Sequence, residues 1–267
     1  MMAAGAIQRR TGLTGRRFGL LLRKELTSLE GLFPVLLGVT LLWELFLVTR
    51  RPTWGPGAVA GLSLIPLGLI PFWAMWAGFQ SVRAEWNGDH AQLLLTLPVP
   101  FWQVQGVKLL AIWLQAALTS LLVAGAAWLL ARELLQELRV SGLWDVIWPS
   151  LPAASLLWGV LLVQLSIVAQ FASAVWRTVP RLGGLVALWA TVLAGWLGGR
   201  LSGLLGYLFQ WVPDLRLLGV SVQGQGAQAV FVRYPILIDS GPLVGGLLFA
   251  LGLFWVGALL LERAADV

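Results

Sequence analysis

Long runs of apolar residues, separated by short polar segments, dominate this chain. A helix that crosses a membrane needs about 20 mostly apolar residues to span roughly 30 Å of hydrocarbon. Six runs approach or exceed that length: Leu32–Thr49, Ala58–Phe79, Leu109–Ala131, Ile147–Val175, Leu182–Leu197 with the residues just beyond it, and Pro242–Leu261. The pattern therefore predicts an all-α fold, a polytopic integral membrane protein with about six transmembrane helices.

Composition points to the same class of protein. Of the 267 residues 58% are hydrophobic and only 11% are charged, and the mean hydropathy is +0.83. A soluble domain carries roughly 25% charged residues, so this chain has too few charges to cover a surface that faces water. Because the chain has no cysteine, disulfides, cysteine-based metal sites and thiol nucleophiles are excluded.

The basic residues predict the orientation of the spans. The net charge of +6 could indicate a nucleic-acid partner, but membrane topology explains it better, and no nucleic-acid partner is expected. Six basic residues cluster near the N-terminus: Arg9, Arg10, Arg16, Arg17, Arg23 and Lys24. If this cluster is cytosolic, the other basic residues lie in slight excess on the external side, so the cluster alone decides the orientation. We therefore predict that both termini are cytosolic and that the membrane is the plasma membrane.

Three regions follow from this topology. Residues 1–31 form a cytosolic segment, residues 32–261 the six-helix domain, and residues 262–267 a cytosolic tail. Within Thr14–Gly31, leucines recur at helical spacing between basic residues, which predicts an amphipathic helix on the inner leaflet, in contact with membrane lipids. The alternative is a basic flank that only orients the first span.

The cytosolic loop of residues 83–101, between the second and third spans, carries the most specific pattern. Asn87-Gly88 is a turn signal, and Asp89 with Gln92 can cap a short helix. Four leucines make that helix apolar before Pro98 and Pro100 end it. Such a helix either rests on the membrane or docks in a groove on a partner protein, and the residues alone leave both open.

This loop and its flanks resemble the permease subunits of ABC-2 type transporters. The resemblance covers roughly residues 20–130. It rests on Glu85-x-x-Gly88, on Leu93-Leu94-Leu95-Thr96-Leu97-Pro98-Val99-Pro100 followed by Lys108 in a long apolar helix, and on Arg23-Lys24-Glu25-Leu26 ahead of the first span.

The resemblance implies an assembly and a contact surface. In that family the loop is a coupling helix that seats in a cleft of a separate ATP-binding cassette subunit, and a second permease subunit, identical or different, completes the transporter. Carried over, the contact residues are Glu85, Asp89, His90, Leu93, Leu94 and Thr96. The function implied is transport driven by ATP, most simply export, of a substrate that the sequence does not identify.

The lysines agree with a permease that has no ATPase site of its own. A P-loop needs a lysine after its glycine-rich turn, and neither Lys24 nor Lys108 stands in such a frame. No cofactor is expected. With His90 as the only histidine, neither a histidine-based zinc site nor a Ser-His-Asp arrangement is expected.

Two further features keep alternatives open. Glu44 is the only acid well inside a predicted span; it is either an intramembrane polar site or a side chain that reaches the interface. As an intramembrane site it would favour an ion-coupled secondary transporter. The external segment 200–241 predicts either re-entrant or external helices, or a helix over Leu182–Val212 followed by a loop. Glycines at 195, 199 and 203, and at 241 and 245, allow close packing within the chain or in a dimer.

Overall fold

Six helical spans are present in the computed structural model, which describes residues 18–26, 33–86, 100–134, 144–179, 182–223 and 230–265. Within these residues six helical stretches are long and apolar enough to cross a membrane. This confirms the predicted all-α, polytopic membrane fold. The spans are Phe33–Trp54, Pro56–Arg83, Phe101–Leu130, Asp145–Thr178, Gly183–Phe209 and Ser240–Arg263.

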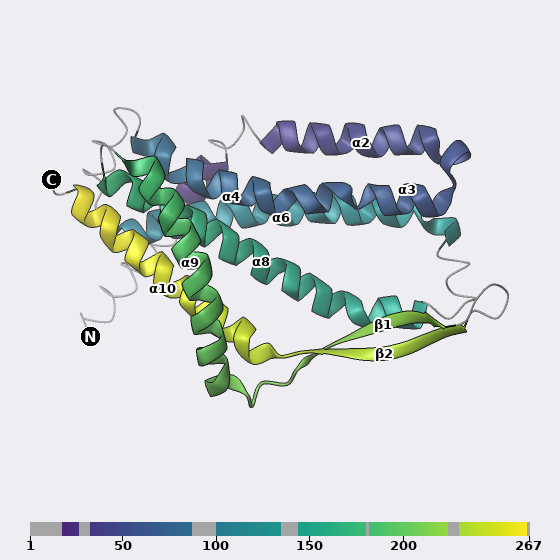
Figure 1. Cartoon of the computed structure of the whole chain (residues 1–267). Coiled ribbons are helices and arrows are strands. Elements are labelled where there is room, and N and C mark those ends of the chain that lie inside the picture. Colours follow the sequence, from purple (N-terminus) through teal and green to yellow (C-terminus); the bar gives the residue numbers. More distant parts are fainter. Residues whose placement is uncertain are drawn as a thin grey trace, which may run out of the picture.

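The spans and the segments between them form an ordered series of elements (Figure 1). They are α2 (Phe33–Trp54), α3 (Pro56–Ser63), α4 (Ile65–Trp86), α6 (Phe101–Leu130), α8 (Trp144–Thr178), α9 (Gly183–Gly206), the 3₁₀ turn η2 (Tyr207–Phe209), β1 (Leu215–Gln223), β2 (Val230–Ile238) and α10 (Ser240–Ala265). Residues 18–26 are also helical. We call the end where α2 and α6 begin and α4, α8 and α10 end the proximal end, and the other the hairpin end.

Helix α8 joins two groups of helices. It packs against α4 on one side and against α9 and α10 on the other, while α2 packs on α3 and α6. Figure 1 shows α2, α3, α4 and α6 side by side, and α9 and α10 crossing one another at the left of the picture. At 1.5 Å per residue the 35 residues of α8 are about 50 Å long, more than the roughly 30 Å of hydrocarbon. Part of α8 therefore extends past the bilayer.

The second span is broken between α3 and α4. Helix α3 ends at Ser63 and α4 begins at Ile65, with Leu64 as a turn. Pro66 has no N–H to donate to the carbonyl of Leu62, which is the acceptor four residues earlier. That oxygen accepts a backbone N–H at the end of α3, and the indole Nε1 of Trp43 in α2 also donates to it, at 3.0 Å. The neighbouring helix thus adds a hydrogen bond at the point where the regular pattern is interrupted.

In the segment 200–241 the structure largely agrees with the helix expected over Leu182–Val212, because α9 and η2 run from Gly183 to Phe209. It differs after that point, where strands replace the expected external helices or loop. Helix α9 continues to Gly206, then η2 closes the turn, and the rest forms an antiparallel hairpin of β1 and β2. The run Leu215–Val222 has β-branched residues and lies after Pro213, and these properties suit a strand. The apolar content of this run suggested contact with lipid. In a strand, however, successive side chains point to opposite faces, so the apolar residues of the run are divided between the two faces of the hairpin.

Each outer edge of the hairpin is protected in its own way. The backbone N–H of Leu218 in β1 donates to Ser150 Oγ of α8 at 2.9 Å. Its cross-strand partner on β2 is Pro235, which has no N–H to offer at that edge. Both devices hinder pairing with another strand. An ion pair between Arg233 and Asp145, 3.6 Å apart, also holds the hairpin against α8.

Candidate functional site

The predicted coupling helix lies outside the described residues. This applies to Asp89, His90, Leu93, Leu94 and Thr96, and to the side chain of Glu85, whose backbone closes α4. Their contacts with an ATP-binding subunit stay a prediction. The structure does describe the two flanks of the loop, the end of α4 and the start of α6 after Pro100. Both flanks lie at the proximal end.

A buried ion pair lies at the same end. The Nζ of Lys108, two turns into α6, is 3.1 Å from Oε2 of Glu25 in the helical segment 18–26. Their side chains are only 5% and 8% exposed. Separating a buried pair is costly, because each charge is then left in an apolar environment without its partner. The contact therefore fixes the N-terminal helix to the third span.

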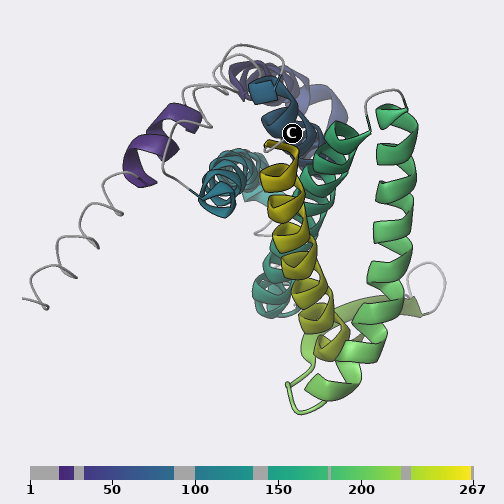
Figure 2. The ribbon, with the colours of Figure 1, turned by 90° about the vertical axis from the view of Figure 1, so that its left-hand side faces the viewer.

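The N-terminal helix presents two different faces. Leu21 and Leu22 are partly buried and Glu25 is buried, whereas Phe18, Leu20 and Leu26 are exposed. Figure 2 shows this helix beside the start of α6 and on the side of the bundle away from α9. The described residues thus form the expected helix, and its exposed apolar face suits contact with lipid.

Polar side chains also link α4, α6 and α8 within the bundle. Gln170 Nε2 donates to Ser81 Oγ at 3.2 Å, and Ser173 Oγ donates to the carbonyl of Phe79 at 3.0 Å. Trp113 Nε1 donates to Ser166 Oγ at 2.8 Å. Hydrogen bonds of this kind add to packing where lipid gives helices no hydrophobic reason to associate. These hydrogen bonds connect α8 to α4 and to α6.

Glu44 lies inside the protein and does not reach the interface. Its side chain is 6% exposed, and neither carboxylate oxygen has a hydrogen-bond partner among the described residues. Helix α2 runs from Phe33 to Trp54, so Glu44 stands near the middle of the helix. Arg51, on the same face, pairs at 3.0 Å with Glu133.

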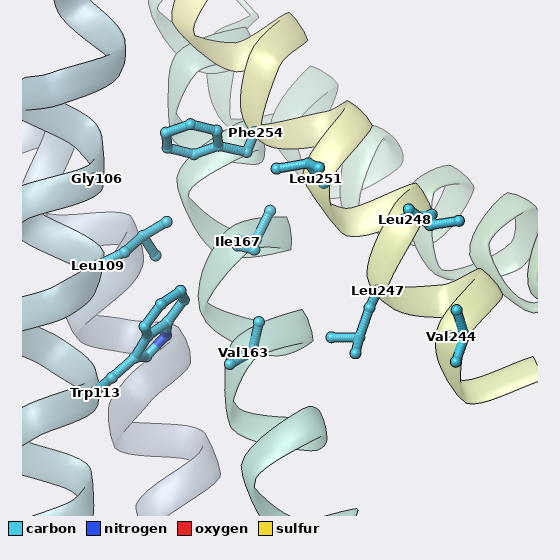
Figure 3. A pocket seen from close by; sticks show the side chains of 10 residues that line it. All are labelled: Gly106, Leu109, Trp113, Val163, Ile167, Val244, Leu247, Leu248, Leu251 and Phe254. Carbon is cyan, nitrogen blue, oxygen red and sulfur yellow. The ribbon is translucent and has the colours of Figure 1, made fainter. Parts of the chain in front are cut away.

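An apolar cavity of about 410 Å³ opens between α6, α8 and α10 (Figure 3). Its one polar side-chain group, the indole N–H of Trp113, is already bonded to Ser166. A ligand there would meet only apolar surface, which suits an aliphatic chain. The lining residues are Gly106, Leu109, Trp113, Val163, Ile167, Val244, Leu247, Leu248, Leu251 and Phe254.

Within the described ranges no three His, Cys, Asp or Glu residues lie close enough together to hold a metal ion. No family model, curated protein or solved structure matches the chain. Any function must therefore be argued from the residues and their geometry.

Sequence reasoning missed three features of this arrangement: the ion pair, the β-hairpin and the break in the second span. It singled out Glu25 and Lys108 separately, yet a pairing between residues 83 positions apart has no local signal. It also missed the β-hairpin. The break at Pro66 was readable in principle, because proline inside an apolar run marks an interrupted helix.

Proposed function

We propose that this chain is the membrane-spanning permease subunit of an ATP-driven ABC transporter, and that separate ATP-binding cassette subunits dock on its proximal end. The observation that supports this best is the buried Glu25–Lys108 pair. It joins the Arg23-Lys24-Glu25-Leu26 segment to the helix that carries Lys108. Both segments belong to the pattern that resembles ABC-2 permeases, and the two flanks of the predicted coupling loop, the end of α4 and the start of α6, lie at the same end.

The pair gives the proposed coupling a mechanical basis. Force on the loop at residues 87–99 would reach α6 directly at Pro100, and through Lys108 it would also reach the N-terminal helix. Two charges that leave water together are costly to separate. The loop, the N-terminal helix and the third span would therefore move as one unit when nucleotide binds to the partner.

In the proposed transporter both termini are cytosolic, the membrane is the plasma membrane, and a second permease subunit completes the assembly. The cargo is a lipophilic or amphipathic molecule that leaves the cytosol or the inner leaflet. The apolar cavity between α6, α8 and α10 supports this class of cargo, because it offers no bare polar group to a hydrophilic one.

One observation favours a second candidate, an ion-coupled secondary transporter. Glu44 is buried at mid-helix beside the broken second span, and transporters of that kind bind their ions at broken helices near the midplane. The two candidates differ in partner. A stoichiometric ATPase subunit that co-purifies with the chain supports the first, and a chain that transports alone, driven by an ion gradient, supports the second.

The coupling loop provides the decisive test. Burying one leucine contributes about 1.5–3 kcal/mol, so Leu93→Ala with Leu94→Ala should weaken assembly with the ATP-binding subunit by about tenfold or more. The measurement is recovery of that subunit with affinity-purified full-length chain from native membranes, after normalisation to folded permease. Fold should be preserved, because the spans do not depend on the loop.

The matched control changes the same chemical groups elsewhere. Leu41→Ala with Leu45→Ala removes two leucines that are 53% and 62% exposed on the outer face of α2. This control should retain the ATP-binding subunit at wild-type level. Equal recovery with the loop variant and the control would contradict the docking role, and the ABC proposal would lose its main support.

A further inference from the structure

Glu44 belongs to the inward face of α2. Thr40, Glu44 and Leu47 are the buried residues of this helix, spaced about one turn apart, whereas Leu41, Leu45 and Val48 are more than half exposed. The carboxyl group is therefore enclosed by protein rather than by lipid. At 1.5 Å per residue it stands about 15 Å from either end of α2 and about 9 Å along the helix from Arg50, which places it within the apolar part of the span.

The break in the second span lies at the same depth. Trp43 donates to the carbonyl of Leu62, and Leu47 shares a buried cluster with Val59. Because the two helices are antiparallel, these contacts place Glu44 level with Gly61 and Leu62, in the last turn of α3. Ser63, the last residue of α3, is completely buried. The carboxyl group thus lies at nearly the same depth as the point where the helical hydrogen-bond pattern is interrupted.

The nearby donors are already used by backbone carbonyls. Thr40 Oγ donates to Leu36 O at 2.8 Å, and Ser63 Oγ donates to Ala60 O at 2.8 Å. Trp43 Nε1 is used by Leu62. Among the residues that the structure describes, no donor reaches either oxygen of Glu44. An ionised carboxylate buried in this way would be very costly, since nothing compensates the lost hydration.

The neighbouring elements bring no compensating charge. Helix α3 contains no titratable residue, and the only one in α6 is Lys108, paired with Glu25 at the proximal end. In α4 the charged residues are Arg83 and Glu85, in its last turn. On α2 itself Arg51 pairs with Glu133, and the guanidinium of Arg50 lies over the rings of Phe46 and Trp54, at 5.3 and 6.0 Å from their centroids.

We propose that Glu44 is a proton-binding site within the membrane, between α2 and the α3–α4 break. A proton makes the carboxyl group neutral and requires no further ligands, whereas a metal ion would need several oxygens around it. Glu44 holds the proton while the surrounding helices enclose it, and releases the proton when water reaches the carboxyl group. Intramembrane acids at such places mark proton paths. The site is independent of the ATP-binding partner, so it suits either transporter mechanism.

Dicyclohexylcarbodiimide, a lipophilic reagent, tests the protonation state. The carboxyl proton moves to a carbodiimide nitrogen, the carboxylate oxygen adds to the central carbon, and the adduct rearranges to a stable N-acylurea without loss of any atom. Full-length protein in lipid nanodiscs should become modified at Glu44 at neutral pH, and the modification should decrease as the pH rises. Glu25, held as an ion pair with Lys108, is the internal control and should remain unmodified. Peptide mass spectrometry separates the two sites.

Infrared difference spectroscopy keeps the proposal falsifiable if the reagent cannot reach the site. The carbonyl band of a protonated carboxyl group should be present in wild type, disappear at alkaline pH, and be lost in Glu44→Gln. Glutamine copies the shape of the neutral acid, so the variant should fold. A wild-type spectrum without a carbonyl band that depends on Glu44, from acidic to alkaline pH, would overturn the proposal. Either result leaves the docking of an ATP-binding subunit untouched.

Discussion

At the scale of single residues, the ion pairs differ in how far they are buried. Lys108 and Glu25 are buried and paired, whereas Arg51 and Glu133 pair with side chains 33% and 66% exposed. The two pairs have nearly the same length, 3.1 and 3.0 Å. Their energies should nevertheless differ, because water screens the exposed pair and not the buried one.

We expect Lys108→Met to destabilise the protein by about 3–5 kcal/mol, because it leaves the buried carboxylate of Glu25 without this cation. The double change Lys108→Met with Glu25→Leu should recover most of that loss. Thermal unfolding of the purified protein in detergent measures both effects. Arg51→Met is the control and should cost at most about 1 kcal/mol. If the double variant were no more stable than Lys108→Met alone, the pair would not be the cause of the loss.

At the scale of elements, glycines set how closely helices approach. A Cβ on Gly78 of α4 would lie 2.8 Å from the carbonyl oxygen of Ser166 in α8, and one on Gly245 of α10 would lie 2.6 Å from the carbonyl oxygen of Ser202 in α9. Gly195, Gly199 and Gly203 have no described atom within 4 Å of such a Cβ. Gly78 and Gly245 serve packing within the chain, which the sequence allowed for Gly245 and did not indicate for Gly78. The three glycines of α9 have no such close neighbour.

Two glycines of the same helix provide a direct comparison. We expect Gly78→Ala to destabilise the protein by about 1–3 kcal/mol, because the new methyl group forces α4 and α8 apart. Gly68→Ala, also in α4, has nothing within 4 Å and should be neutral or slightly stabilising. The difference between the two unfolding midpoints cancels the shared gain in helix propensity. Equal midpoints would show that α4 and α8 do not touch at Gly78.

At the scale of the whole molecule, the two ends of the helical bundle carry different features. The proximal end carries the buried ion pair and the flanks of the predicted coupling loop, and the hairpin end carries an antiparallel ribbon packed on α8 (Figure 1). Hydrophilic partners of the two ends must lie on opposite sides of the membrane. The orientation therefore decides which end could meet an ATP-binding subunit.

We expect both termini to face the cytosol, since the basic N-terminal cluster dominates the orientation. The chain has no cysteine, so single-cysteine labelling needs no background removal. In intact cells a thiol reagent that cannot cross the membrane should label Arg216→Cys in the hairpin and should not label Gly5→Cys or Ala265→Cys. Lysed cells supply the control in which all three react. Labelling of either terminus from outside would place the coupling loop on the wrong side for ATP-binding subunits.

The sequence by itself determined the class of protein and the number of spans. Both follow from local composition, because every 20-residue apolar run must find lipid whatever its neighbours do. The candidate coupling residues were also readable from the chain alone, and they remain predictions. Glu44 was visible as an acid within an apolar run, but its environment was not.

Tertiary structure decided everything that depends on which helices meet. The Glu25–Lys108 pair joins residues far apart in the chain, and the burial of Glu44 depends on the helices that pack against α2. The hairpin at 215–238 is stable because α8 extends far enough to cover one of its edges. A two-stranded ribbon is marginal in isolation, so its formation depended on a surface supplied by another part of the chain.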